Sequence, residues 1–386
     1  MSGPHRFAVL AAATLLVLAT VSGPTMWRAP DDAAITGPYA SLLAASTDLG
    51  PSRAADAQLT VMLSGAAPPG TLIGWADAHG LAVRWRTGDD WAIVTGPAGR
   101  LAAAFAVPVH DYRGRRGQVF YASTHQPPLP FALRGEVTAV GRILSYLPHR
   151  TARPAFPRDV PRPGLTPRHL LTTYNATPLV DAGYTGKGAT IVIFGFDGYD
   201  QRDLDMFADI SGLPRFAPVV IGAPLDPPHG ETVMDLEVAH AIAPDARLVV
   251  VNARPTLQGG GTFEKIGRMF DDAARRFPGS VWSLSIGWGC DAFAAEADLA
   301  PVRAALTNAH RRGITVFDAT GDIGGLECKG GKDWSTAPGP HDIGVDTIAA
   351  LPEITAVGGT TLSTDLDGRW LQEQAWIDVP MSQGSS

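Results

Sequence analysis

Two carboxylates one helical turn apart are the first candidate for chemistry in this chain. Glu231 and Asp235 open a predicted helix over residues 231–242, and their spacing of four places both side chains on one face. Neighbouring carboxylates can share a proton and act as a coupled acid–base unit. A solvated helix face is the common alternative for such a pair. The rest of this helix is mostly apolar, which favours burial, and buried carboxylates need a compensating role.

A glycine-rich loop holds the second candidate. Asp322 lies in the stretch Ala-Thr-Gly-Asp-Ile-Gly-Gly, residues 319–325, shortly after a predicted strand. Glycines let the chain turn sharply and approach a ligand closely, although an Asp in such a loop is often only a turn residue. A third segment, residues 283–289, ends another predicted strand and carries Trp288, which could line a substrate site or cover the core. Ligands of open α/β sheets bind at the carboxyl ends of strands, so all three segments are candidates.

Strands and helices alternate from residue 189 onward. The strands are short continuous apolar runs, as expected for parallel strands that are buried on both faces. This alternation predicts an α/β fold, a parallel sheet with helices on both faces. The predicted strands are 191–194, 219–221, 248–251, 281–286 and 315–317, and the predicted helices are 201–211, 231–242, 262–277 and 299–312.

Residues 57–112 follow another pattern, with apolar and polar residues in alternation. The element order β-α-β-β-α-β predicts a small α+β domain of the split βαβ type, with an antiparallel sheet and two helices on one face. The preceding residues 30–56 are expected to be poorly structured. The strands are expected near 59–63, 81–85, 91–93 and 107–112, and the helices near 72–76 and 101–105.

Two further segments are expected to lie outside the folded domains. Residues 7–21 are apolar, follow His5 and Arg6 and precede small residues, which is typical of a secretory signal within residues 1–29. This run is shorter than the ~20 residues that span a bilayer, although an uncleaved membrane anchor is the alternative. Residues 147–167 contain six prolines among several arginines, so they predict an exposed, extended linker that is open to proteolysis.

Charge is unevenly distributed in a chain whose net charge is −7. Residues 81–162 carry 12 arginines against five acidic groups, whereas residues 163–386 carry 16 basic and 28 acidic groups. A nucleic-acid binder would be basic overall or would show one basic stripe, so no nucleic-acid partner is expected. The basic block is expected to dock on the acidic one and to be released as carboxylates become protonated in acid.

The chain has two cysteines, Cys290 and Cys328. In an exported protein they would meet an oxidising compartment, where disulfides persist. Two cysteines allow one pairing, and we predict that disulfide; two buried thiols are the alternative.

Several motifs, in their order along the chain, resemble those of the sedolisin family, the serine-carboxyl peptidases with a subtilisin-like fold. Residues 57–146 resemble the pro-kumamolisin activation domain, and residues 168–386 resemble the peptidase domain. No single motif is decisive, but their order and spacing together are specific. The motifs include residues 183–188 (Gly-Tyr-Thr-Gly-Lys-Gly), Gly230-Glu231-x-x-x-Asp235-x-Glu237 with Ala243-Pro244, Gly321-Asp322, and residues 355–360 (Thr-Ala-Val-Gly-Gly-Thr).

The resemblance implies a secreted serine-type endopeptidase that is made as a proenzyme and acts on proteins or peptides in acid. Glu231 would be the general base, Asp235 its orienting partner and Asp322 the acid that stabilises the oxyanion. A carboxylate base suits acid, where a histidine would be protonated, and a protonated Asp322 could donate a hydrogen bond to the oxyanion. The activation domain would be the enzyme's own intramolecular inhibitor and chaperone. The membrane would be a partner only if the N-terminal segment stays uncleaved.

Ordinary subtilisins are the rival family. His229-Gly230 is similar to their His-Gly-Thr motif, and Asp197-Gly198 to their Asp-x-Gly motif. The residues that follow His229 are Gly-Glu-Thr, however, and Asp322 stands where subtilisins use Asn. Both differences favour the serine-carboxyl version, with His229 as a loop residue.

One part of the family pattern has no match in the chain. The family's nucleophile is a serine in a Gly-Thr-Ser stretch beyond the Gly-Gly-Thr segment, and its calcium ligands lie further on. Ser385 and Ser386 are expected to be loop residues. Calcium is thus expected from the family without ligands here, and the chain alone is expected to be inactive. The alternatives are a peptidase that lacks its C-terminal part in this sequence, an inactive secreted peptidase-like protein that binds peptides or a partner, and an unrelated α/β binding protein.

Overall fold

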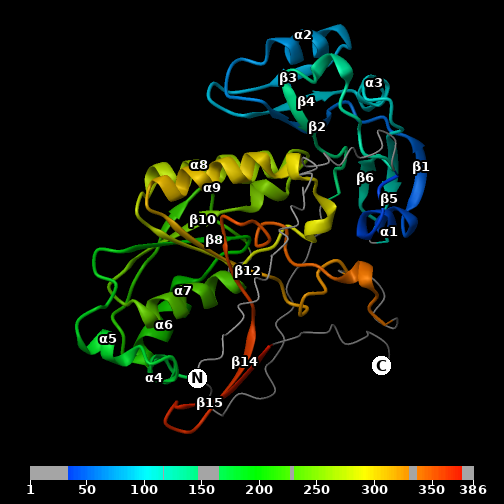
Figure 1. The fold of residues 1–386 in the computed structure, drawn as a ribbon. Coiled ribbons are helices and arrows are strands. Elements are labelled where there is room, and N and C mark those ends of the chain that lie inside the picture. The colour runs from blue at the N-terminus through cyan, green and yellow to red at the C-terminus, as the bar shows by residue number, and fades with distance from the viewer. Residues whose placement is uncertain (1–33, 116, 147–164, 227–229, 330–336, 376–386) are drawn as a thin grey trace, which may run out of the picture.

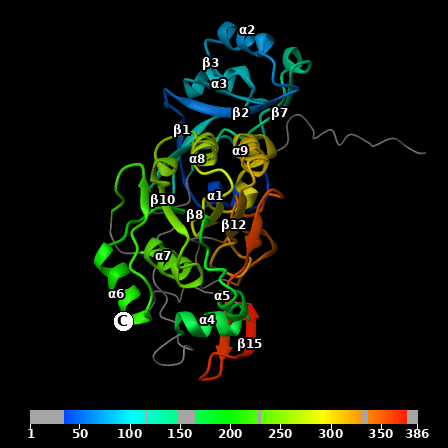
Figure 2. The ribbon, with the colours of Figure 1, turned by 90° about the vertical axis from the view of Figure 1, so that its left-hand side faces the viewer.

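The computed structural model describes residues 34–115, 117–146, 165–226, 230–329 and 337–375 (Figure 1). The predicted signal segment and residues 147–164 of the predicted linker lie outside these ranges, as do His229, Ser385 and Ser386. An N-terminal unit of two small sheets packs on one end of a larger layer of helices and parallel strands (Figures 1 and 2). No helix in the described ranges is long and apolar enough to cross a bilayer.

The larger layer is a parallel sheet, as predicted. In the described residues it has six strands in the order β13-β12-β11-β8-β10-β9, and every pair in it is parallel. The strands are β8 (Thr190–Gly195), β9 (Val219–Ile221), β10 (Arg247–Asn252), β11 (Val281–Leu284), β12 (Thr315–Ala319) and β13 (Thr355–Val357).

Helices cover both faces of this sheet (Figure 2). On one face, Val192 and Phe194 of β8 join a core that includes residues of α8 and α9. On the other face, Ile193 packs with residues of α6 and α7. Successive β8 residues therefore face two separate cores, which explains why the strand is a continuous apolar run. The helices are α6 (Gln201–Ser211), α7 (Glu231–Ile242), α8 (Thr262–Arg276) and α9 (Ala300–Arg311), and α4 (Pro167–Thr173) and α5 (Thr177–Asp181) precede them.

The N-terminal unit contains a four-stranded antiparallel sheet in the order β3-β4-β2-β7 within the described ranges. Its core also takes in residues of both predicted helices, among them Leu72 and Leu101. The elements are β2 (Ala57–Leu63), α2 (Gly70–Ala78), β3 (Ala82–Arg84), β4 (Trp91–Gly96), α3 (Ala98–Ala104) and β7 (Val137–Val140).

Two expectations for this unit were wrong. The predicted last strand, 107–112, corresponds to β5 (His110–Arg113), which pairs with β1 and β6 in a separate three-stranded sheet, and β7 takes its expected place. Residues 30–56, expected to be poorly structured, include α1 and β1. Local alternation predicts that a strand exists but not which strand it pairs with, because pairing depends on contacts distant in the sequence. The elements of this second sheet are α1 (Pro38–Ala44), β1 (Thr47–Pro51) and β6 (Val119–Ala122).

The basic N-terminal unit contacts acidic groups of the larger layer. Arg84 lies 2.5 Å from Glu264 of α8, and Arg86 lies 3.0 Å from Asp271 of the same helix. Both carboxylate oxygens of Asp298 accept the backbone N–H of Arg142, at 3.0 and 3.1 Å. The two arginine–carboxylate pairs join opposite charges, as the charge distribution along the sequence suggests, whereas Arg142 contributes its backbone N–H to Asp298.

A short hairpin, β14 (Thr360–Thr364) with β15 (Trp370–Ala375), lies near the C-terminal end of the described residues. It extends away from the parallel sheet (Figure 1). The hydroxyl of Thr173 in α4 donates a 2.6 Å hydrogen bond to the carbonyl oxygen of Gly368, which ties the hairpin turn to that helix.

The structure joins Cys290 and Cys328 in a disulfide, with their Cα atoms 4.8 Å apart. We expect the unreduced, denatured protein to show no reaction with a thiol reagent, and the reduced sample to show two thiols per chain. Because the bridge closes a loop of 38 residues in sequence separation, C290S/C328S should lower the free energy of unfolding by about 4 kcal/mol. Two reactive thiols before reduction would contradict the bridge.

Docking of the N-terminal unit should depend on pH through two carboxyl groups, Glu264 and Asp298, whose pKa values shift in opposite directions. Burial raises the pKa of Glu264, but hydrogen bonds and charge from Arg84 and Arg268 outweigh it and lower this pKa overall. Burial raises the pKa of Asp298 to about 6, despite its hydrogen bonds from Ala295 and Arg142. A lowered pKa stabilises docking at neutral pH and loses this effect as pH falls through the lowered value, whereas a raised pKa favours docking in acid.

We therefore expect the N-terminal unit to stay docked at pH 5–6 and to weaken only below about pH 4.5, the ordinary pKa range of Glu. A protease site inserted between residues 147 and 164 would allow the two fragments to be tested for co-elution across pH. E264Q should weaken docking about 3–10-fold at pH 7 and remove most of the loss in acid, while E296Q, with an exposed carboxylate, should change neither. Complete release already at pH 6 would contradict the prediction that docking weakens only in stronger acid.

Candidate active site

Three adjacent strands of the parallel sheet end at one edge, and a polar residue follows each of them. The strands are neighbours in the order β12-β11-β8. Asp197 follows β8, Ser285 follows β11 and Asp322 follows β12. The carboxyl ends of parallel strands meet at the same sheet edge, where α/β proteins bind ligands.

Asp197 fixes the start of helix α7 at this edge. Its carboxylate accepts the backbone N–H groups of Glu231 and Thr232 at 3.2 and 3.0 Å, and the Thr232 hydroxyl donates to its carbonyl oxygen at 3.0 Å. These bonds satisfy N–H groups that a helix start leaves free, at the end of the helix that favours an anion. A Cβ at Gly230 would collide with the Asp197 carboxylate, and one at Gly195 with the Thr232 hydroxyl. Two glycines therefore permit the close approach of helix and strand.

Glu231 begins α7 beside three other carboxylates. Burial is the largest cause that raises its pKa to about 8, and the charges of Asp235, Asp322 and Asp197 add to it. The structure therefore brings Glu231, Asp235 and Asp322 near one another, although two come from a helix and the third from a distant loop. Among the described residues, no hydrogen bond donor reaches the carboxylate of Glu231.

Asp235 is held by Ser285, which directly follows β11, the strand next to β8. The hydroxyl of Ser285 donates a 2.9 Å hydrogen bond to its Oδ1 atom. Burial raises the pKa of Asp235 to about 6, the bond from Ser285 lowers it, and the charge of Asp197 raises it again. This bond fixes the direction of the Asp235 carboxylate, one helical turn after Glu231. The third candidate segment thus contributes Ser285 to the site.

Trp288, from the same segment, covers the core. It is 4% exposed, its indole N–H donates to Thr256 at 2.9 Å, and its ring meets Phe196 edge-on at 5.6 Å. Of the two alternatives open for this residue, the structure favours core cover over a substrate wall.

Asp322 is an exposed residue on the loop that follows β12. Its backbone N–H donates to the carboxylate of Glu327 at 2.9 Å, and the preceding Gly321 has a φ of 107°, which favours glycine. The loop turns sharply, as its glycines predicted.

Buried acidic residues lie behind this loop. Asp318, Asp346 and Glu327 are 1%, 2% and 7% exposed. Neither carboxylate oxygen of Asp318 has a hydrogen bond partner in the described part of the chain. Burial, and then the charge of Asp346, raise the pKa of Asp318, and burial raises that of Asp346 to about 7. Like charges this deeply buried are stable only when protons or N–H donors neutralise them.

Several residues of the site were not predicted from the sequence. Asp197 was noted only as part of a subtilisin-like motif, Ser285 only within the segment 283–289, and Glu327 not at all. The rule that ligands bind at strand ends could have identified Asp197 and Ser285, since each follows a predicted apolar run closely. Glu327 gives no such signal, because only the fold of the loop brings it back to Asp322.

A general base must be ionised, and the described residues alone do not keep Glu231 ionised in acid. With a pKa of about 8, Glu231 carries a proton at neutral and acidic pH. A hydroxyl that donates to it would stabilise the ionised form and lower this pKa. Glu231 is thus poised to share a proton with such a donor.

The candidate metal-ligand group in the described residues does not suit calcium. One group of three ligand-type side chains lies close together in them, namely Cys290, Asp291 and Cys328, within 4.8 Å of one another. Two of these are joined in the disulfide, and calcium takes 6–8 oxygen ligands. Calcium therefore stays a prediction from the family resemblance, with no ligands assigned in this chain.

Comparison with known proteins agrees with this geometry. Residues 70–146 match the profile of the pro-kumamolisin activation domain. Kumamolisin from Bacillus sp. (strain MN-32) is 28% identical over 328 residues, which cover 79% of this chain and 56% of the relative. Sedolisin from Pseudomonas sp. (strain 101) is 28% identical over 312 residues, 75% of this chain and 50% of the relative. The chain thus spans about half the length of these curated relatives.

A solved structure is also similar. It is Pseudomonas sedolisin, a serine-carboxyl proteinase in complex with two molecules of pseudo-iodotyrostatin, with 26% identity and a TM-score of 0.45 over 55% of this chain and 58% of that chain. Together, the activation-domain match and the two curated relatives show that the chain is similar to the serine-carboxyl peptidases of the sedolisin family.

Proposed function

We propose that this chain belongs to a secreted serine-type endopeptidase that is made as a proenzyme and cleaves proteins or peptides in acid. The observation that supports it best is the approach of Glu231, Asp235 and Asp322 at the carboxyl edge of the parallel sheet. These are the residues that the family resemblance names as base, orienting partner and oxyanion acid. The proposal covers the whole protein's activity, because the chain spans only about half of its relatives.

The roles follow from the surroundings of each carboxyl group. Glu231 would accept the proton of a nucleophilic hydroxyl, whose hydrogen bond would also lower the pKa of about 8. Asp235, held by Ser285, would orient Glu231 and take part in sharing the proton. Asp322, exposed on its loop, would donate a hydrogen bond from its protonated carboxyl to the developing oxyanion. We assign the nucleophile to no residue of the sequence.

The N-terminal unit would act as the intramolecular inhibitor. It matches the activation domain over residues 70–146 and contacts the larger layer through Arg84, Arg86 and Arg142. Cleavage in the predicted linker, 147–167, would separate it from the peptidase part. The disulfide and the predicted signal support a secreted protein in an oxidising compartment.

The activity itself can be measured on the product of the complete open reading frame that encodes these residues. After incubation in acid, it should digest a denatured protein substrate between pH 3 and 6. E231Q, D235N and D322N should each lower kcat by roughly 10²–10⁴-fold, the range for loss of an acid–base or oxyanion group. E296Q, which changes an exposed carboxylate, is the matched control.

A wild-type product without activity anywhere between pH 3 and 7 would overturn the proposed function. Specific binding of a denatured protein without cleavage would then support the alternative, an inactive peptidase-like binding protein.

The raised pKa of Glu231 also predicts a change in stability with pH. A carboxyl whose pKa rises from 4.5 to about 8 on folding stabilises the protein in acid, and this contribution is lost as pH rises from about 4.5 to 8. E231Q removes the charge but keeps the shape, so it should stabilise the chain by about 2 kcal/mol at pH 8.5, after allowance for partial exposure, and by little at pH 4. Thermal unfolding of both proteins at pH 4, 6 and 8.5 measures this difference. A difference that is constant across pH would contradict the raised pKa.

A further inference from the structure

We propose that Glu327 is a positioning residue that holds the Asp322 loop in place, and that the Cys290–Cys328 disulfide supports Glu327. The proposal rests on the proposed function, because Asp322 is the oxyanion acid there. It adds a role to a buried carboxylate that has no part in the base, its partner or the oxyanion group.

Glu327 contacts the peptide that joins Gly321 to Asp322. Glu327 is 7% exposed, and its Oε1 atom accepts the Asp322 N–H at 2.9 Å. A Cβ at Gly321 would collide with the same carboxylate. The carboxylate therefore lies directly against the Gly321–Asp322 peptide. A hydrogen bond is electrostatically stronger where water is excluded.

The position of that peptide determines where the Asp322 carboxyl group points. An aspartate has only two side-chain torsions, so the direction of its carboxyl group is set largely by its backbone. Donors that stabilise an oxyanion must be held to within a fraction of an ångström by their supports. On an exposed loop, a bond to the Asp322 N–H supplies that support.

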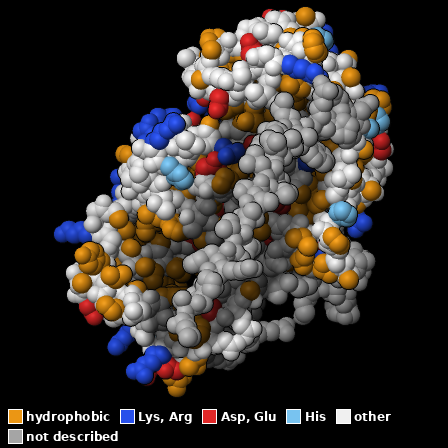
Figure 3. Space-filling model, in the orientation of Figure 1, with side chains coloured by type: hydrophobic (Ala, Val, Ile, Leu, Met, Phe, Trp, Pro, Cys, Tyr) orange, Lys and Arg blue, Asp and Glu red, His pale blue; other side chains and the backbone are white. Residues whose placement is uncertain are grey.

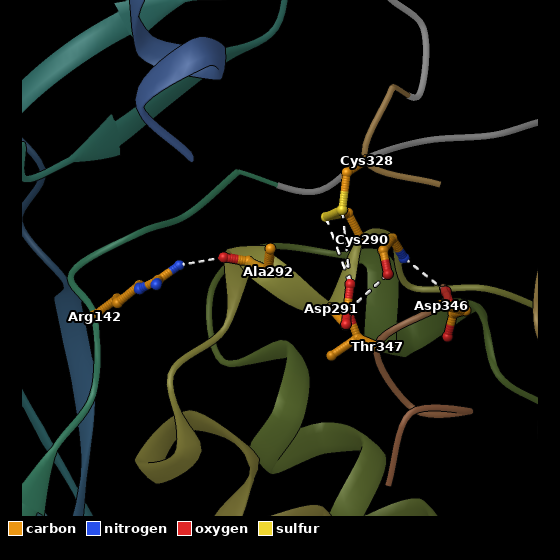
Figure 4. Close-up of a disulfide and its surroundings, with 8 residues drawn as sticks. Arg142, Cys290, Asp291, Ala292, Cys328, Asp346 and Thr347 are labelled. Atoms are coloured by element: carbon orange, nitrogen blue, oxygen red, sulfur yellow. Dashed lines mark hydrogen bonds between the residues drawn. A yellow bond between two sulfur atoms is a disulfide. The ribbon is translucent and has the colours of Figure 1, made fainter. Parts of the chain in front are cut away.

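Glu327 is itself held by a backbone hydrogen bond and by the disulfide at the next residue. Its backbone N–H donates to the carbonyl oxygen of Gly344 at 3.1 Å, and the Gly344 N–H donates to Gly325 at 2.9 Å. The next residue is Cys328, which the disulfide ties to Cys290, shortly after β11 (Figure 4). A Cβ at Gly344 would collide with the Cys328 sulfur, so the segments around the bridge are closely packed.

The other end of the loop is tied to the same place. The Asp346 N–H donates to the carbonyl oxygen of Thr320 at 3.1 Å, two residues before Asp322. The Asp346 carboxylate accepts the N–H of Gly289 at 2.8 Å, next to Cys290, and Figure 4 shows Asp346 beside the bridge. Both ends of the loop are thus anchored to the segment that follows β11.

The first experiment measures the Asp322 amide in the full chain, labelled with [¹⁵N]aspartate, by NMR hydrogen exchange. The D322N spectrum identifies the signal. E327A should speed exchange of the Asp322 amide at least tenfold. E327Q keeps an acceptor oxygen at the same reach and should stay within about threefold of wild type, while E327D keeps a carboxyl group but retracts it and should resemble E327A. C290A/C328A should also speed exchange at Asp322.

The matched control is D365A. Asp365 also accepts backbone N–H bonds, from Asp367 and Arg369, but it does so in the β14–β15 turn. It should leave the Asp322 signal unchanged. Unchanged exchange in E327A, or equal acceleration in E327Q and E327A, would overturn the positioning role. Unchanged exchange in C290A/C328A would overturn the support by the disulfide.

The second experiment uses the complete open reading frame product. E327A should lower kcat at least tenfold with KM within about threefold, and E327Q should restore most of the loss. An active wild type whose kcat is unchanged by E327A overturns this proposal and leaves the proposed function standing. An inactive wild type in which exchange at Asp322 still depends on Glu327 overturns the proposed function and leaves the positioning of the loop standing.

Discussion

The site depends on the cost of placing several negative charges together at the buried edge of a sheet. Asp197, Glu231, Asp235 and Asp322 influence one another, and Asp318, Asp346 and Glu327 are buried nearby. Charges this close repel strongly, and burial adds a desolvation penalty for each. The fold meets this cost with backbone N–H groups, one hydroxyl and bound protons. Three strand ends and one helix start must be held in register to bring those donors to the carboxylates.

Hydrogen bond donors and exposure together separate the supporting carboxylates from the one that is left for chemistry. Asp197 takes two N–H groups of α7, Asp346 takes those of Gly289 and Ile348, and Asp235 takes the Ser285 hydroxyl. Glu231 and Asp318 receive no hydrogen bond on their carboxylates in the described part of the chain. Asp318 is 1% exposed, whereas Glu231 is only partly buried and its pKa is raised to about 8. A group that is partly buried, protonated and without a donor is the one whose proton can move when a ligand arrives.

Local periodicity accounts for what the sequence could predict. Helix α7 spans the predicted residues 231–242, and five of the six parallel strands of the described residues lie close to their predicted ranges, because each is a local apolar segment. The sixth strand, β13, was not predicted. Periodicity says nothing about partners, so β7 was missed as a sheet strand and β5 was placed in the wrong sheet. The same limit applies to the site. Glu231 and Asp235 are neighbours on one helix, whereas the bond from the Asp322 amide to Glu327 exists only because the loop turns back at Gly321 and is held by residues near Gly344.

The supports of the Asp322 loop come from the parallel-sheet part of the molecule, although the N-terminal unit reaches the same place. Arg142 donates through its guanidinium to the carbonyl oxygen of Ala292 at 2.6 Å, two residues after Cys290 (Figure 4). Loss of the N-terminal unit would remove that bond and the Arg142 bonds to Asp298. It would leave the disulfide, the Asp346 bonds and the Glu327 bond intact, because none of them involves a residue of the N-terminal unit. The N-terminal unit therefore contacts a segment that is already tied to the loop, and its removal need not disturb the geometry on which Asp322 depends.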